Sequence, residues 1–163
     1  MTASPKLDRI DINILAQLQK NGRLANVELA EAIGLSPSPC LSRVRRLEDA
    51  GYIVSYCARL HLSKLVEHIT VFTEVTLNDH RREDFIKFEA DIRRYEALQE
   101  CHLVSGGYDY LLKFVIKNVA RYQELMESIL DRNIGVEKYF SYIVIKTVFD
   151  RGPVPLKSLM GEK

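Results

Sequence analysis

Residues 26–50 contain two short amphipathic segments that are separated only by a glycine and a two-residue connection. In the first segment, NVELAEAI, Asn26 is the expected N-cap and Gly34 the C-terminal stop. The second segment begins at Pro37 or Pro39, because the first N–H of a helix has no intrahelical partner and a proline there loses nothing. Two helices joined so closely predict a helix-turn-helix, which makes DNA binding the leading hypothesis.

A further helix is expected before this pair. Apolar residues recur at helical intervals from Leu7 to Gln19, and Asn21-Gly22 supplies the stop. The residues predicted to point inward are Leu7, Ile10, Ile14, Leu15 and Leu18 in this helix, and Leu29, Ala30 and Ile33 in the next. After Gly51 the sequence YIVSYCARLHL is rich in β-forming residues, which predicts a strand or wing leaving a three-helix head.

The second helix of the pair has two different faces. At 100° per residue, Cys40, Val44 and Leu47 form one stripe, which is expected to pack on the other two helices. Residues 36–47 also hold three serines and three arginines and no acid. Hydroxyls near a helix N-terminus bond phosphate or a base edge, and the arginine fork matches guanine or phosphate. The residues predicted to meet DNA are Ser36, Ser38, Ser42, Arg43, Arg45 and Arg46.

The alternative is an ordinary solvated helix surface, the usual fate of a run of charges. It explains neither the absence of acids nor the helix-turn-helix spacing. The net charge is only +1, and residues 1–60 carry eight Lys and Arg against six Asp and Glu. The charge argument therefore rests on local placement in residues 36–47, and it leaves open which arginine reads bases and which holds phosphate.

The second half of the chain alternates strands and helices in the order β-α-β-β-α-β. Ile69–Leu77 alternates between two faces, which predicts a strand with one buried face, and a Gly-Gly centre at 106–107 predicts a tight hairpin. The other strands are expected at about 98–104, 110–116 and 137–149, and the helices at about 85–95 and 119–132. The residues of the second helix expected to face the core are Tyr122, Leu125, Met126, Ile129 and Leu130.

The predicted fold class is therefore α+β, with a winged-helix-like head followed by a ferredoxin-like domain. The expected boundaries are residues 1–59 for the head, 60–67 for a hinge, 68–150 for the ferredoxin-like domain and 151–163 for a tail. The tail is expected to be extended, because Pro153 and Pro155 cannot join a β-ladder.

The loop Ser105-Gly106-Gly107-Tyr108-Asp109 is a second candidate site. Two residues without side chains allow a ligand to approach backbone N–H groups, a geometry suited to an α-carboxylate, and Asp109 can meet an ammonium. A free amino acid carries both charges. A simple tight turn with a solvated Asp109 is an alternative that the residues alone support about as well.

Other clusters do not predict catalysis or metal binding. Cys101 and His102 are adjacent on an expected strand, so their side chains point to opposite faces, and VSGGY is not a nucleophile elbow. The three cysteines include no CxxC, which argues against a disulfide framework and fits a reducing cytoplasm. Neither a membrane-spanning run nor the apolar core of a signal peptide is recognisable. We expect no enzymatic activity, no metal and no cofactor.

The segments LDRIDINIL, NVELAEAIGLSPSPCLSRVRRLEDAGYI and QECHLVSGGYDYLLK closely resemble the Lrp/AsnC family of feast/famine transcription factors, over about residues 7–150. The resemblance implies a DNA-binding head and a ligand-sensing domain that assembles into homodimers and usually larger rings, such as tetramers or octamers. The residues implied to surround the effector, commonly an amino acid, are Ser105, Gly106, Gly107, Tyr108, Asp109, Tyr142 and Thr147. Gly107 stands where the family often has an acidic or polar residue.

These observations predict a cytoplasmic, sequence-specific transcriptional regulator that binds double-stranded DNA and responds to an amino acid at its C-terminal domain. An architectural DNA protein without an effector is the alternative. A third reading, an RNA-binding or catalytic second half, is disfavoured because LLKFVIKN lacks the glycine and paired aromatics of an RNA-recognition motif. The identity of the effector, the target operators and the sign of regulation do not follow from the sequence.

Overall fold

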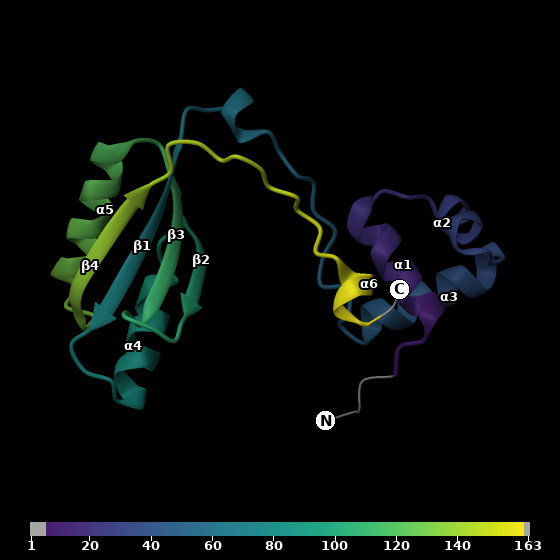
Figure 1. Cartoon of the computed structure of the whole chain (residues 1–163), viewed down its shortest axis with the longest axis horizontal. Helices are drawn as coiled ribbons and strands as arrows, with labels where there is room; N and C mark the ends of the chain where they lie inside the picture. The colour runs from purple at the N-terminus through teal and green to yellow at the C-terminus, as the bar shows by residue number, and fades with distance from the viewer. Residues whose placement is uncertain (1–5, 162–163) are drawn as a thin grey trace. The chain divides into compact units, whose positions relative to one another are not determined.

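The computed structural model describes residues 6–161. They belong to two compact units, Met1–Arg59 together with Phe149–Lys163, and Leu60–Val148. We call the first the head unit and the second the sheet unit (Figure 1). The chain leaves the head unit after Arg59 and returns to it at Phe149.

The three predicted helices of the head unit are present. They are α1 (Arg9–Lys20), α2 (Asn26–Ile33) and α3 (Pro37–Asp49). Their apolar stripes meet in one core, which consists of Ile14, Leu29, Ala30, Cys40 and Leu47 with partly buried neighbours that include Val44. Gly34 ends α2 in the left-handed conformation at φ 74°, as its sequence position predicts.

The expected N-cap of α2 is wrong. Ala25 occupies that position, and its N–H donates to Glu28 Oε2 at 2.9 Å. Asn26 lies inside the first turn, and its Nδ2 donates to the carbonyl of Pro37 at 2.7 Å. The side chain of Asn26 therefore ties the start of α2 to the start of α3 instead of capping its own helix.

The prolines of the tail predict an extended segment, but the tail is not wholly extended. Leu156–Leu159 forms the short helix α6, which packs against α1 within the head unit. With its amide oriented to satisfy both groups, the Gln19 side chain donates to the carbonyl of Val154 at 3.0 Å and accepts from its N–H at 3.2 Å. Pro155 precedes α6, where the missing N–H of proline costs no helical bond.

The stretch expected as a strand or wing after Gly51 forms no strand, since residues 52–61 are neither helical nor extended in a ladder. A strand needs a neighbouring strand to bond, and this stretch belongs to no β-ladder among the described residues; its backbone bonds at Tyr52 and Ile53 go to the carbonyl of Leu47 at the end of α3. Val54 is consequently 92% exposed. The hinge region that follows contains the short 3₁₀ helix η1 (Leu62–Lys64).

The sheet unit has the predicted β-α-β-β-α-β order, and the α+β fold class is confirmed. Its elements are β1 (Ile69–Leu77), α4 (Arg82–Ile92), β2 (Leu98–Leu103), β3 (Tyr110–Ile116), α5 (Val119–Asp131) and β4 (Val136–Ile143). The strands form one antiparallel sheet in the order β2-β3-β1-β4. Both helices lie on the same side of this sheet (Figure 1).

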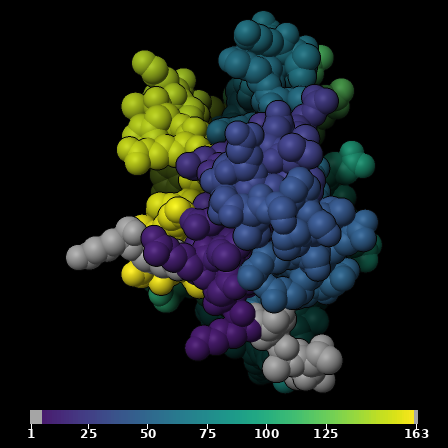
Figure 2. All heavy atoms as spheres, turned by 90° about the vertical axis from the view of Figure 1, so that its right-hand side faces the viewer, coloured from purple at the N-terminus to yellow at the C-terminus, as the bar shows by residue number. Residues whose placement is uncertain are grey.

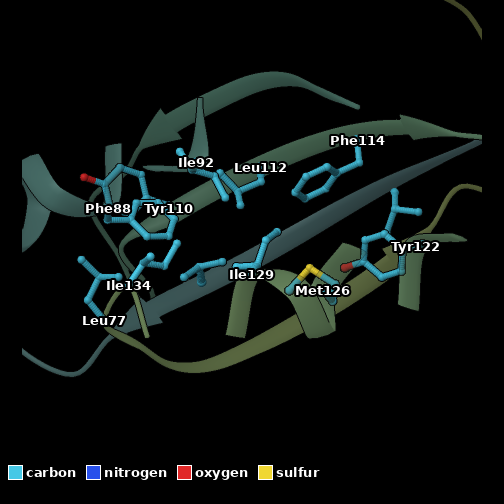
Figure 3. Close-up of a cluster of buried hydrophobic side chains, with 12 residues drawn as sticks. Leu77, Phe88, Ile92, Tyr110, Leu112, Phe114, Tyr122, Met126, Ile129 and Ile134 are labelled. Carbon is cyan, nitrogen blue, oxygen red and sulfur yellow. The ribbon is translucent and has the colours of Figure 1, made fainter. Parts of the chain in front are cut away.

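The core of the sheet unit lies between that side of the sheet and the two helices (Figure 3). Phe88 of α4 stacks on Tyr110 of β3 with ring centroids 4.6 Å apart. The one buried hydroxyl of β1, Thr73, lies 2.8 Å from Tyr122 Oη, which lies 2.6 Å from Ser141 Oγ. The alternation predicted for β1 is confirmed, including its polar member at Thr73.

Two expectations for this unit are wrong. The last strand ends at Ile143 instead of continuing to Phe149, because its partner β1 begins at Ile69 and offers no backbone beyond the bond from Val144 N–H to Thr70 O. Leu130 is exposed rather than directed to the core. It follows Ile129, which is buried, so it points away from the contact face of α5.

Neither α4 nor α5 lies on the other face of the sheet (Figure 1). Phe140 and Tyr142 of β4 lie opposite Glu74 and Phe72 of β1 on this open face, and they are 56% and 52% exposed. Two large aromatic side chains are thus exposed on this face of the sheet.

Candidate nucleic-acid interface and effector loop

The outward face of α3 presents the side chains that the sequence predicts for DNA contact. Ser38, Ser42, Arg45 and Arg46 line a shallow hollow of about 600 Å³, together with Leu41, Asp49 and Ala50. Ser36 is exposed at the N-cap position of the helix. Figure 2 shows the helix-turn-helix segment in blue beside the purple atoms of α1. The structure therefore brings five of the six predicted residues to one surface.

Arg43, the sixth residue, is turned toward α1. Its Nη1 lies 2.8 Å from Asp8 Oδ2 and 2.8 Å from Asp11 Oδ1, and its side chain is only 27% exposed. Arg46 joins the same cluster, since its Nη2 donates to Asp11 Oδ2 at 2.6 Å. The cluster of two acids and two arginines therefore fastens α3 to the start of α1.

The two acids had no role in the expectations from sequence. Asp8 caps α1 by accepting from the N–H of Asp11 at 2.8 Å, and the N–H of Asp8 donates back to Asp11 Oδ2 at 3.1 Å. A usable signal exists, because Asp11 stands four residues after Leu7 and three before Ile14, on the stripe that faces the core. An acid on such a stripe predicts a buried cationic partner.

The pairing of Asp8 with Arg43 favours the charged forms of both groups. The pKa of Asp8 is lowered, first by the hydrogen bond from the N–H of Asp11 and next by Arg43. Hydrogen bonds to Asp8 and Asp11 raise the pKa of Arg43. On the opposite face of α3, burial raises the pKa of the Cys40 thiol, as expected for a packed residue and not for a nucleophile.

The loop 104–109 connects β2 to β3 at the end of the sheet. The N–H of Val104 donates to Asp109 O at 2.9 Å and closes the loop around the two glycines, as the sequence predicts. A Cβ placed on Gly106 or Gly107 would meet no atom within 4 Å. The space beside both glycines is open, so packing within the described chain does not require them.

Asp109 makes more hydrogen bonds within the chain than its sequence position suggests. Its Oδ2 accepts from the N–H of Leu77 at 2.8 Å and lies 3.1 Å from His80 Nε2, and its side chain is 16% exposed. Its own N–H donates to the carbonyl of Val75 at 2.9 Å. Asp109 thus fixes the loop to β1, and its carboxylate already holds two partners.

The two residues of the last strand region lie differently. Tyr142 is on the open face of the sheet, where its hydroxyl donates to Glu74 Oε2 at 3.2 Å. The pKa of Tyr142 is raised by desolvation, then by Glu74 and then by Tyr108, which places the loop tyrosine in its electrostatic neighbourhood. Thr147 lies beyond the end of β4 at an exposed position.

Comparison with known proteins covers both units. The winged helix-turn-helix DNA-binding family matches residues 7–54, and the Lrp/AsnC ligand binding domain matches residues 70–154. The chain is 45% identical to the leucine-responsive regulatory protein of Salmonella typhimurium over 152 residues, and the alignment covers 93% of each chain. The chain belongs to the Lrp/AsnC family. The leucine-responsive regulatory protein of Escherichia coli K12 has the same identity and coverage.

Solved structures of the Lrp/AsnC type agree with this assignment. A transcriptional regulator from Neisseria meningitidis, in complex with L-Met, is 34% identical, with a TM-score of 0.86 over 94% of this chain and 99% of that one. An AsnC family regulator from Agrobacterium tumefaciens is 28% identical, with the same TM-score and coverage. The protein is thus a DNA-binding transcriptional regulator with an Lrp/AsnC ligand-binding domain.

Membership of the Lrp/AsnC family confirms that the chain is a regulator and not an enzyme. Within residues 6–161, no three His, Cys, Asp or Glu side chains are grouped so that they could hold a metal ion. Nor does any helix in that range have the length and apolar character needed to cross a bilayer.

Proposed function

We propose that this regulator recognises specific DNA sequences with the outward face of α3. The observation that carries the proposal is the exposed row of Ser36, Ser38, Ser42, Arg45 and Arg46 on the second helix of a packed helix-turn-helix. Serine hydroxyls at the helix N-terminus suit phosphate, and the two arginines supply forked donors. Arg43 contributes from the flank, where it holds α3 on α1.

Footprinting on the DNA upstream of the protein's own gene tests this proposal. A protected segment that survives competition by unrelated duplex is the expected result. Arg45→Ala and Arg46→Ala should weaken the protection, whereas Arg9→Ala, which removes an exposed arginine of α1, should not. Protection that is lost equally for all three variants, or absent at low ionic strength in the parent protein, contradicts the proposed surface.

The proposed effector is an amino acid, bound at the loop that holds Ser105, Gly106, Gly107, Tyr108 and Asp109. Both glycines are exposed and have open space where a Cβ would lie, which supports close approach of a carboxylate to the backbone, and Tyr142 and Thr147 are proposed as further contacts. The relative from Neisseria meningitidis was solved with L-Met, which supports this class of ligand. No cofactor is included in the proposal.

A screen of the proteinogenic amino acids by thermal shift tests the effector. A ligand that binds the folded state raises the melting temperature in proportion to its occupancy, so a selective response from one or a few amino acids is expected. A flat response to every amino acid would favour the second candidate, an architectural DNA protein whose loop 105–109 serves only assembly.

We further propose that the open face of the sheet is covered by a second copy of the chain. Exposed Phe140 and Tyr142 provide the apolar area, and a homodimer carries two heads, so the second DNA contact becomes intramolecular. Larger rings built from such dimers, and action in the cytoplasm, belong to the same proposal. Sedimentation of the parent protein beside Phe140→Glu checks it, since the charged variant should shift toward the monomer.

A further inference from the structure

The carboxylate of Asp11 is buried in the head unit, and apolar packing alone does not explain an acid at this position. Asp11 is 0% exposed and carries a carboxylate, whereas the other described buried residues of this unit are hydrophobic. Burying an unpaired carboxylate is strongly unfavourable, so its retention needs compensating partners. The structure supplies them from α3, because Arg43 donates to one oxygen and Arg46 to the other.

The two arginines use this carboxylate in different ways. The Nη1 of Arg43 bonds both Asp8 and Asp11, and its side chain is mostly buried. Arg43 therefore holds α3 against α1. Arg46 is 46% exposed, bonds Asp11 through Nη2, and also lines the hollow on the outward face. A guanidinium has five N–H donors in a rigid fork, so the donors of Arg46 that do not face Asp11 remain for a ligand.

We propose that Asp11 is a positioning residue for DNA recognition, which holds the guanidinium of Arg46 in the orientation that α3 presents to the duplex. The inference rests on the proposed DNA-binding function of that face. A free arginine loses side-chain freedom when it is immobilised at an interface, which lowers affinity about two- to tenfold. A guanidinium already fixed by Asp11 avoids most of this loss.

The same carboxylate also lowers the local charge. Asp8 and Asp11 balance Arg43 and Arg46, so the cluster has no net charge and Arg45 is the uncompensated cation of the row. Non-specific binding depends on net positive charge, whereas specific binding depends on where the donors point. Asp11 therefore weakens non-specific attraction to DNA while it fixes the orientation of the Arg46 guanidinium. Its loss should affect specific and non-specific DNA binding in opposite directions.

Asp11→Asn tests this by competition binding to the operator and to unrelated duplex at one salt concentration. We expect operator affinity to fall about two- to tenfold, the cost of ordering one side chain, while affinity for unrelated DNA is unchanged or higher. Asp8→Asn is the matched control, since Asp8 contacts Arg43 but not Arg46 and should leave the ratio of the two affinities unchanged. An equal loss on both DNAs, or the same change of ratio in Asp8→Asn, would overturn the inference.

A double-mutant cycle identifies the arginine through which Asp11 acts. In an Arg46→Ala background, Asp11→Asn should cause no further loss of operator preference, and additive losses would contradict the inference. If Asp11→Asn does not fold, Arg46→Lys replaces it, because lysine keeps the charge but cannot bond Asp11 and DNA with one planar fork. Parental operator preference in Arg46→Lys would then overturn the inference.

The failure of this inference is distinguishable from failure of the proposed function. If neither Arg45→Ala nor Arg46→Ala weakens operator binding, the α3 face itself is wrong. If Arg46→Ala weakens operator binding and Asp11→Asn leaves the affinity ratio at the parental value, only the positioning role of Asp11 is wrong.

Discussion

Arg59 and Asp150 form an ion pair that joins the segment leaving the head unit to the segment returning to it. Both side chains are exposed, and an exposed pair of this kind contributes only about 0–1 kcal/mol. The attachment of the tail therefore depends mainly on α6. Leu156 and Met160 border an apolar hollow of about 780 Å³ together with residues of α1 and the segment 52–56.

Truncating the apolar contact of α6 should loosen the tail. We expect Leu156→Ala to lower the free energy of unfolding of the head by about 1 kcal/mol, because Leu156 is half-buried and loses part of its transfer free energy. Lys157→Ala on the same helix is the exposed control. Urea denaturation measures both variants, and equal stabilities for the two would mean that α6 does not stabilise the head.

Removing the carboxylate of Asp109 should destabilise the sheet unit as well as alter any ligand response. Asp109→Ala leaves the N–H of Leu77 without its acceptor, which costs about 1–3 kcal/mol for a group removed from water. Asp131→Ala, at an exposed position at the end of α5, is the control. Thermal unfolding compares them, and a melting temperature of Asp109→Ala equal to that of the control would contradict this role.

Gly107 offers a cleaner probe of the effector loop. A Cβ at this exposed position meets no atom within 4 Å, so Gly107→Val should fold with nearly parental stability. The new side chain should nevertheless block close approach of a carboxylate to the loop and abolish the thermal shift by amino acids. Lys117→Val, in another exposed loop, should retain that shift. An undiminished response in Gly107→Val would remove this loop from the binding site.

The Asp8 cap should make the stability of the head sensitive to acid. Its pKa is lower in the folded protein than the ordinary value of 3.8, so its contribution is present above that value and is lost as pH falls through the folded pKa. Asp8→Asn should therefore be less stable than the parent near neutral pH, and the difference should shrink below about pH 4. Asp49→Asn, at an exposed position, provides the comparison. A pH-independent difference for Asp8→Asn would contradict this assignment.

Periodicity predicted the elements whose partners are local or whose faces differ strongly in polarity. The bounds of β1 and β3 were predicted correctly because apolar and polar residues alternate along β1 and because Gly-Gly marks the turn before β3. Cys40 and Leu47 were correctly assigned to the core, since their spacing places them on one stripe of α3.

The errors arise where structure depends on partners distant in sequence. Residues 52–61 and 145–149 have β-forming side chains but no described strand beside them. The carboxylate of Asp11 is bonded by arginines 32 and 35 residues away in sequence. The carboxylate of Asp109 is bonded by an N–H 32 residues away. Composition and spacing carry no record of such pairings, so the ion pairs of Arg43 with Asp8 and Asp11 were not predicted, and its contact with DNA stays a prediction.

The most direct test of the account is a salt titration of operator binding by Arg45→Ala, with Arg9→Ala as the control of equal charge. Arg45 is exposed on the outward face of α3, and Arg9 is exposed on α1. The account predicts that Arg45→Ala weakens operator binding by about 1–3 kcal/mol, and that the salt slope falls by about one if Arg45 holds phosphate. Operator affinity and salt slope in Arg45→Ala equal to those of Arg9→Ala would show that α3 does not face the duplex.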